Sequence, residues 1–487
     1  MTMCDNTTTM SSCIISQNDF LVFFNIENKD IETFDIHHQK DGIYIDVTLK
    51  KKPHQCPVCL NMTDRVKDYS VKHINHSILT NKKCIINYRA RRYRCPKCHK
   101  TFMESNPFTV AGSRISLATV YNILEDLRKP NMTFRDVAER YHISQTTAAH
   151  VFDSFVSISR RPLPEYLLID EVYAFKSAHS KYVCVLVDFE TQNIVDVLPS
   201  RRKQTLMDYF FSIPLEERKN VKIVSFDMWE TYRIVSKIMF PNAICATDHF
   251  HVKQEFGRKI DRVRIDVMNK YYSRKKYLEK KKEKTKTEKL ELKEASKHYY
   301  ALKKFNWMFF SNDNRIFDPN EKKIYNHTLE GYYNYYDILE FMVRHDSVLD
   351  LAYDLKYELD EFYSRSNEKN ALKNIEELII SFRNSQIKEM MDFGNTLVKW
   401  KYEIVNSFVP ANGRRISNGL IENRNKSIKL LKHSSNGYLN WHRFKTRIMY
   451  SLNKDSTYHL YPIKNKGDFT EWWQEKRFIH WLWTIMM

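Results

Sequence analysis

The pattern of apolar and polar positions between residues 166 and 247 predicts a mixed sheet with two helices. The first three apolar runs are short, rich in Val and Ile, and only a few residues apart, which favours an antiparallel meander. Each later run follows a stretch with helical periodicity. The predicted strands are 166–171, 181–188, 193–198, 221–226 and 243–247, and the predicted helices are 203–211 and 229–239.

Two of these strands lead to acidic residues, Asp170 in the first and Asp227 directly after the fourth. The order of three strands, helix, strand, helix and strand is typical of the ribonuclease H-like fold, in which two such carboxylates lie side by side at one sheet edge. A third acid is then expected on a helix from elsewhere in the chain. Glu171 should point to the opposite face of its strand from Asp170, in a supporting or structural role.

A helix that begins near residue 417 offers a candidate for the third acid. Ser417 or Asn418 can cap its first turn. A carboxylate one turn from lysines suits a place where a metal ion meets a phosphate backbone, but an ordinary surface Glu–Lys pair explains the same spacing. Four residues at i, i+3, i+4 and i+7 share this face: Glu422, Asn425, Lys426 and Lys429.

Two Cys-x-x-Cys pairs lie near the N-terminus, Cys56 with Cys59 and Cys95 with Cys98. Such pairs predict a tetrahedral structural zinc site, and the gap between them leaves room for a β-hairpin. Chance pairing is the alternative; a redox function is disfavoured because no thioredoxin-like strand and helix surround either pair.

Basic residues interleaved with tyrosines near the second cysteine pair make a candidate phosphate-contacting face. The alternative is a solvated basic strand. The basic residues include Arg91, Arg92 and Arg94.

Two short helices, 133–141 and 145–155, are predicted on either side of a turn. A small residue in the first helix, an apolar residue in the turn and Ser144 as a cap form a helix-turn-helix pattern. An ordinary pair of packed helices explains the pattern too. In a helix-turn-helix, four residues of the second helix would face the major groove: Gln145, Thr146, Thr147 and His150.

The rest of the chain carries weaker signals. Residues 1–20 are polar and expected to fray, and 261–408 are expected to be mostly helical. The Lys-rich segment 273–304 is interpreted as a solvated helical face, with a DNA-tracking surface as the alternative. The aromatic tail 456–487 is expected to pack against its own protein or to contact another subunit.

The amino-acid composition indicates a polyanionic binding partner. The 487-residue chain carries 78 Lys and Arg against 59 Asp and Glu, a net charge of +19, which favours phosphate binding through counterion release. A basic protein from a Lys-rich proteome is the alternative.

No apolar run reaches the ~18 residues of a membrane span, and the N-terminus lacks the pattern of a secretory signal. The cysteines outside the two pairs have no regular spacing, which favours a reduced, cytosolic protein.

Taken together, these motifs resemble the DDE transposases of bacterial insertion sequences in the ISL-three family. The resemblance extends over nearly the whole chain. Its most specific parts are Asp248-His-Phe-His251 and Asn418-Gly-x-x-Glu422-x-x-Asn425, in this order and joined by a helical insertion. The Lys-rich insert around residues 276–289 is longer than in the family pattern.

The resemblance implies a catalytic triad of Asp170, Asp227 and Glu422 that binds two Mg²⁺ ions, for which Mn²⁺ can substitute. It places Asp248 and His251 near the active site, with His251 either assisting catalysis or serving as a structural histidine. Lys426 and Lys429 would steady the phosphate backbone. It further implies double-stranded DNA as partner, at inverted-repeat ends and target, a homo-oligomer on DNA, and a cytoplasmic, nucleoid-associated protein in bacteria.

Two other functions are open at this point: a catalytically inactive DNA-binding regulator derived from a transposase, and a nuclease without strand transfer. The expected fold class is α+β and multidomain, with a ribonuclease H-like core interrupted by an α-helical insertion. The expected domains are a zinc-binding domain (1–110), a helix-turn-helix domain (111–160), the first part of the core (161–260), the insertion (261–408), the second part of the core (409–455) and the tail (456–487).

Overall fold

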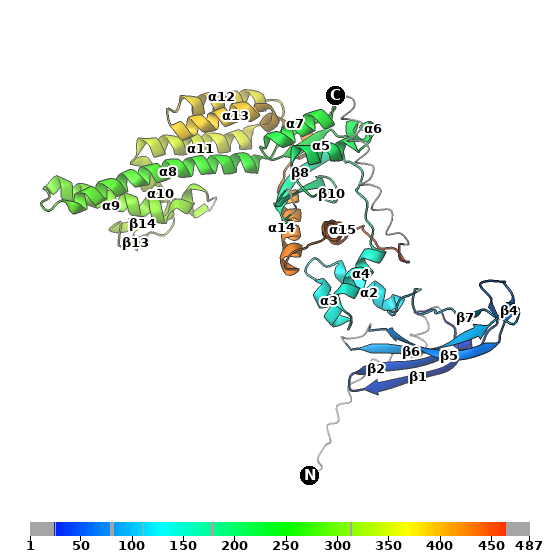
Figure 1. Cartoon of the computed structure of the whole chain (residues 1–487). Coiled ribbons are helices and arrows are strands. Elements are labelled where there is room, and N and C mark those ends of the chain that lie inside the picture. Colours follow the sequence, from blue (N-terminus) through cyan, green and yellow to red (C-terminus); the bar gives the residue numbers. More distant parts are fainter. Residues whose placement is uncertain are drawn as a thin grey trace, which may run out of the picture. The chain divides into compact units, whose positions relative to one another are not determined.

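The computed structural model describes residues 24, 26–77, 82–110, 112–176, 180–311 and 314–463 (Figure 1). The chain divides into two compact units, one of residues 1–159 with 427–487 and one of residues 160–426. The expectations for residues 1–20 and for the tryptophans of the tail lie outside the described residues. None of the helices in the described ranges is long and apolar enough to cross a membrane.

The first unit contains a five-stranded sheet in the order β1-β2-β6-β5, with β7 paired to β6. Strands β2 and β6 are parallel and the other neighbours are antiparallel. The β5–β6 hairpin fills the gap between the two cysteine pairs. The elements are η1 (Asn28–Asp30), β1 (Ile31–Gln39), β2 (Gly42–Leu49), β3 (His54–Gln55), β4 (Met62–Thr63), β5 (Val66–Asn75), β6 (Cys84–Arg94) and β7 (Thr101–Met103).

Three helices follow this sheet in the first unit, and a fourth arrives from the C-terminal part of the chain. Each of the first three begins at a Ser or Thr whose side chain accepts a backbone N–H of the first turn. The buried Arg447 of the fourth helix donates to the backbone carbonyls of Lys129 and Met132, at 3.0 and 2.9 Å. The helices are α2 (Leu117–Leu127), α3 (Phe134–Arg140), α4 (Gln145–Phe155) and α15 (Trp441–Leu452).

The second unit is built on a five-stranded sheet in the order β10-β9-β8-β11-β12. The predicted antiparallel meander is present in β8–β10, and β11 and β12 join β8 in parallel. Helices precede β11 and β12, because parallel neighbours need a crossover connection. The elements are β8 (Tyr166–Tyr173), β9 (Tyr182–Asp188), β10 (Ile194–Leu198), α5 (Lys203–Phe211), α6 (Leu215–Lys219), β11 (Ile223–Phe226), α7 (Glu230–Met239) and β12 (Ile244–Thr247).

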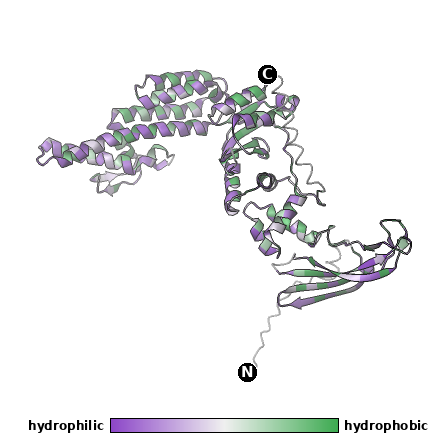
Figure 2. Cartoon of the chain, in the orientation of Figure 1, coloured by the Kyte–Doolittle hydropathy of each residue, from purple (hydrophilic) through white to green (hydrophobic). Residues whose placement is uncertain are grey.

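A helical region follows β12 without a break, because α8 already begins at His249. This long helix therefore crosses residue 260, where the sequence placed the end of the core. Its buried positions Val252, Phe256 and Ile260 continue the core of the sheet into the helical region. The Lys-rich segment is the α8–α9 hairpin, whose far end is mostly hydrophilic in Figure 2.

The last helices of this region return to the sheet. Asn406, at the end of α13, donates its side-chain amide to the backbone carbonyl of Cys245 in β12, at 2.8 Å. The elements are α8 (His249–Lys280), α9 (Lys286–Lys304), η2 (Asn306–Phe309), η3 (Asn314–Ile316), β13 (Ile324–Asn326), β14 (Gly331–Tyr333), α10 (Tyr335–Arg344), α11 (Ser347–Arg365), α12 (Ala371–Asn384), α13 (Lys388–Asn406), β15 (Pro410–Ala411), β16 (Arg414–Arg415) and α14 (Gly419–Ser434).

Candidate functional site

The two cysteine pairs form loops of the same geometry. In each, the residue after the second cysteine is left-handed, Leu60 and His99 both with φ 58°. Its amide donates to the carbonyl of the first cysteine, Cys56 or Cys95, at 3.0 Å. Each loop is thus closed by its own backbone and turns both of its thiols to one side.

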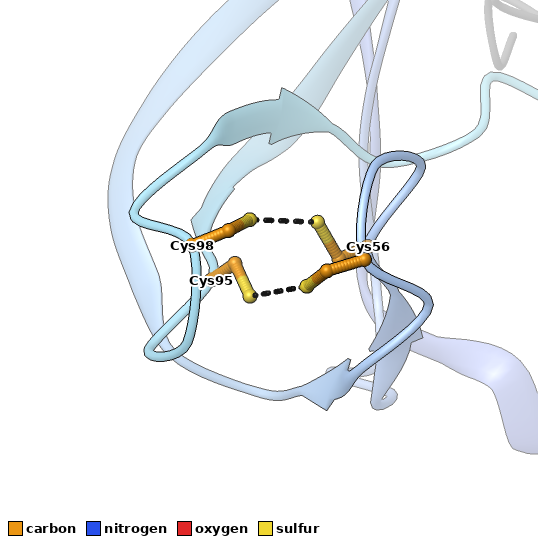
Figure 3. Close-up of side chains that lie close together, drawn as sticks. Cys56, Cys95 and Cys98 are labelled. Atoms are coloured by element: carbon orange, nitrogen blue, oxygen red, sulfur yellow. Dashed lines mark hydrogen bonds between the residues drawn. The ribbon is translucent and has the colours of Figure 1, made fainter.

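The four sulfur atoms gather in one cluster (Figure 3). Sγ of Cys56 is 3.5 Å from Sγ of Cys98, and Sγ of Cys59 is 3.4 Å from Sγ of Cys95. A tetrahedral Zn²⁺ with four thiolates about 2.3 Å away needs sulfur separations of about 3.8 Å, close to those seen. Backbone N–H groups of Cys98 and Lys97 help to lower the pKa of Cys95 to about 6. The cluster therefore suits a structural zinc ion.

The basic residues beside this cluster do not share one face. Arg91 is buried, pairs with Glu32 and lies 3.6 Å from the buried carboxylate of Glu104. The expectation that Arg91 contacts phosphate is therefore wrong: the residue holds the sheet together. Arg94 is exposed, and Arg92 is half-buried in an ion pair with Asp68.

The second helix of the expected helix-turn-helix is α4. His142 in the preceding turn is left-handed, with φ 51°, and Ser144 caps the helix on the amide of Thr147 at 3.0 Å. Gln145 and Thr146 are exposed, and Thr147 is half-buried. Asp153 on the same helix forms an ion pair with Arg443 of α15 at 2.5 Å, and this contact holds α4 against α15.

The structure brings Asp170 and Asp227 together. Strands β8 and β11 are parallel neighbours in which Ile169 is opposite Phe226, so the next residue on each chain is one of the two acids. Carboxylate oxygens of Asp170, Glu171 and Asp227 lie within 4.8 Å of one another. Burial, and then the charge of Asp227, raise the pKa of Asp170 to about 8. The site thus concentrates negative charge that a cation would relieve.

Helix α14 reaches this pair of acids through Asn425. Its buried side-chain amide donates to Oδ2 of Asp170 at 2.7 Å. Ser417 accepts the amide of Gly419 at 3.2 Å, whereas Asn418 is fully buried and accepts the hydroxyl of Ser225 at 2.9 Å. Of the two expected caps, only Ser417 contacts the helix start through its side chain.

Glu422 lies one turn before Asn425 and groups with Asp248 and His251, with one ligand atom of each within 4.8 Å of the others. Nε2 of His251 is 2.5 Å from Oδ1 of Asp227, so His251 stands between Glu422 and the other two acids. Burial lowers the pKa of His251, but Asp227, Asp170 and Asp248 outweigh burial and the pKa is raised overall.

Asp248 precedes α8 and is fully buried, with His249 at 3.2 Å. Burial alone would raise its pKa, yet His249, the Asn418 backbone and His251 lower it overall. Lys426 and Lys429 are exposed on α14, and Lys429 belongs to the first unit.

Sequence reasoning missed the residues that hold Glu171. Its carboxylate pairs with Arg201 and accepts the hydroxyl of Tyr232 at 3.0 Å. The Arg201 guanidinium lies over the rings of Tyr182 and Trp229, 4.5 and 4.6 Å from their centres. No motif marks Arg201, since it lies in a loop after β10 and its partners come from β8, β9 and the residue before α7.

The cysteine cluster and the acidic cluster are the pair of features expected of a transposase, and comparison with known proteins agrees. Residues 167–448, more than half of the chain, match the family model of a transposase, and residues 52–98 match the zinc finger of the transposases IS204/IS1001/IS1096/IS1165. The protein is thus of the class of insertion-sequence transposases. Within that class, the chain belongs to the ISL-three (ISL3) family.

One curated relative is the transposase for insertion sequence element IS1001 of Bordetella parapertussis. The two are 24% identical over 233 residues, which is 47% of this chain and 56% of the relative. The match thus spans little more than half the length of that relative. The family resemblance read from the motifs is confirmed, and so is the zinc-finger assignment.

Proposed function

We propose that this protein binds the terminal inverted repeats of its insertion sequence and cleaves and joins DNA there. Asp170, Asp227 and Glu422 would hold two Mg²⁺ ions. The observation that carries the proposal is the meeting of β8, β11 and α14, which brings Asn425 onto Asp170 at 2.7 Å. The strand order β10-β9-β8-β11-β12 supports a ribonuclease H-like core.

The acidic residues fit this hard cation. Mg²⁺ prefers oxygen ligands, and Asp170, Asp227 and Glu422 supply only carboxylate oxygens. Oδ1 of Asn425 is buried and has no hydrogen-bond partner among the described residues. When bound, two ions would stabilise the attacking and leaving oxygens of an in-line phosphoryl transfer.

The protein's own groups would prepare the site. Asn425 orients Asp170 by donating to Oδ2, while Oδ1 accepts the backbone amide of Glu171 at 2.6 Å. Nε2 of His251 lies 2.5 Å from Oδ1 of Asp227, which places this ring beside the two strand acids. Lys426 lies on the exposed side of α14, one residue past Asn425, where it would contact the DNA backbone.

Binding of the DNA ends would belong to the first unit. Gln145 and Thr146 are exposed at the start of α4, where a helix-turn-helix presents residues to bases. Arg94 and the exposed Arg89, which stacks over Tyr69 at 4.3 Å, offer phosphate contacts beside the cysteine cluster. By family analogy, the protein would bridge two ends as at least a dimer.

The test is cleavage of a plasmid that carries the flanking DNA, in Mg²⁺, by wild type, Glu422→Gln and the control Glu368→Gln. Glu368 is exposed in the loop before α12. Cuts at the element ends and joined target DNA are expected with wild type and the control, and neither with Glu422→Gln. Cut ends without joined DNA would indicate a nuclease. Tight binding without cuts in Mg²⁺ or Mn²⁺ would indicate a regulator.

A further inference from the structure

We propose that the cation position beside Glu422 is a mixed nitrogen–oxygen site, formed by Asp248, His251 and Glu422, which selects Mn²⁺ over Mg²⁺. The inference deepens the proposed function and rests on it in one respect, that Glu422 is a metal ligand. It assigns the role of metal ligand to His251 and Asp248. It also implies that the two cation positions prefer different divalent ions.

The three side chains converge from two helix starts. Asp248 directly precedes α8 and His251 lies in the first turn, so their i, i+3 spacing puts them on the same side of the helix. Glu422 lies in the first turn of α14. One nitrogen and two oxygens within 4.8 Å of one another make a three-ligand set for one ion.

Buried atoms without partners point to a ligand at this place. Nε2 of His251 and both carboxylate oxygens of Asp248 are buried and make no hydrogen bond of normal geometry with any described residue. Nε2 nevertheless lies 2.5 Å from Oδ1 of Asp227. Leaving such atoms unpaired costs about 1–3 kcal/mol each. A cation accepts lone pairs from nitrogen and oxygen alike, so one ion would satisfy several of them.

The identity of the ligand atoms decides which cation fits. Mg²⁺ favours a shell of oxygens and retains water, whereas imidazole is a better ligand for first-row transition ions. Mn²⁺ accepts both carboxylate and imidazole. The pair Asp170 and Asp227 offers oxygens only, because the neighbouring carboxylate of Glu171 is taken by Arg201 and Tyr232. The two positions therefore differ in selectivity.

The experiment uses zinc-loaded, full-length protein without DNA, titrated with Mn²⁺ and followed by electron paramagnetic resonance. Pulsed measurements on the bound Mn²⁺ should show coupling to an imidazole nitrogen. In His251→Asn the coupling should vanish and Mn²⁺ affinity should fall at least about 10-fold, the loss typical of disturbing a metal ligand's surroundings. The Mg²⁺ affinity of His251→Asn, measured by competition with Mn²⁺, should change less than about 3-fold, because Mg²⁺ gains little from an imidazole ligand.

His249→Asn is the matched control, since this ring contacts Asp248 but lies outside the three-ligand set. It should retain the nitrogen coupling, as should Asp170→Asn. Wild-type protein grown with ¹⁵N-labelled histidine must show an altered coupling, which tests whether the coupled nitrogen belongs to a histidine even if a variant does not fold. The comparison of His251→Asn with His249→Asn then assigns the nitrogen to one ring.

Mn²⁺ bound without nitrogen coupling, or coupling that survives in His251→Asn, would overturn the inference. The proposed function would still stand if Mg²⁺-dependent cleavage is observed. Conversely, nitrogen-coupled Mn²⁺ in a protein that cuts no DNA would support this site and contradict the proposed function.

Discussion

The cysteine cluster and the acidic cluster are assembled from very different lengths of chain. Cys59 and Cys95 are 36 residues apart, and each stands in a loop that its own backbone closes. Asp170 and Asn425 are 255 residues apart and meet only because a sheet, a helical region and α14 are all in place.

The difference separates two uses of a metal ion. Four thiolates leave no coordination position free, so zinc in the cysteine cluster can only hold the sheet ends together. The acidic cluster has buried, unsatisfied atoms and a carboxyl group whose pKa is raised to about 8. In the folded protein, this site therefore has buried polar atoms that a bound ligand would satisfy.

The largest expected effect is on the cysteine cluster. Cys95→Ser should release the zinc and unfold the surrounding loops, because a structural zinc ion contributes on the order of 10 kcal/mol to such small modules. Zinc content and protease sensitivity of residues 52–98 measure this. Cys84→Ala is the control, since burial raises the pKa of Cys84 to about 12 and its thiol stays neutral. A Cys95→Ser protein that keeps both its zinc and its protection would contradict the comparison.

A smaller effect is expected from the buried arginine beside the same cluster. Arg91→Met removes the positive charge beside the buried carboxylate of Glu104, which keeps its hydrogen bonds from the Tyr88 hydroxyl and from the backbone amide of residue 91. The loss should cost at most about 3–5 kcal/mol. Arg94→Met, on the exposed end of β6, should cost less than about 0.5 kcal/mol. Urea unfolding followed through zinc release measures both. Equal losses would mean that the burial of Arg91 does not matter to the sheet.

In the acidic cluster, removal of one supporting contact should be milder. Asn425→Ala deletes the amide that orients Asp170 and should lower Mg²⁺ affinity or cleavage by about 10–100-fold, as for other partners of metal ligands. Asn423→Ala, exposed on the same helix, is the matched control. Mg²⁺ titration of cleavage separates weaker binding from slower chemistry. An unchanged titration curve would remove Asn425 from the site.

The smallest effect, when it is compared over a single pH unit, is that of pH on stability. Folding raises the pKa of Asp170 from 3.8 to about 8, so between these values the folded chain binds a proton that the unfolded chain has lost. The stability of the metal-free protein should therefore fall as pH rises from about 4 to 8, by at most about 1.4 kcal/mol per pH unit. Mg²⁺ takes the proton's place and should remove this loss. Unfolding temperatures at several pH values, with and without Mg²⁺, measure this loss. In Asp170→Asn the part of the pH dependence that comes from Asp170 should be absent.

Local patterns in the sequence predicted much of this architecture. The meander β8–β10, the strand ends that carry Asp170 and Asp227, and the cysteine loops each depend on neighbouring residues only. The start of α8 was missed because the helical region was predicted to begin only at residue 261. The apolar spacing of Val252, Phe256 and Ile260 shows the helix once that boundary is dropped.

Contacts between distant segments could not be predicted in this way. Arg91 was expected in a phosphate-contacting face because basic residues are interleaved with tyrosines there. Its burial depends on Glu32 of β1 and on Glu104, which follows β7. Asn418 has a side chain that commonly caps helices, but in the fold its Oδ1 accepts a hydrogen bond from the hydroxyl of Ser225 in β11. The contact of His251 with Asp227 likewise follows from where α8 begins relative to β11.

The 255 residues between Asp170 and Asn425 also impose a delay. At a synthesis rate of roughly 5–20 residues per second, a ribosome needs about 13–50 seconds to make that stretch. For most of this time the new chain has both strand acids, and from the start it has its cysteine loops and helices α2–α4, but it has no α14. A growing chain therefore carries its cysteine loops and helices α2–α4 for many seconds before the contact between Asp170 and Asn425 can form.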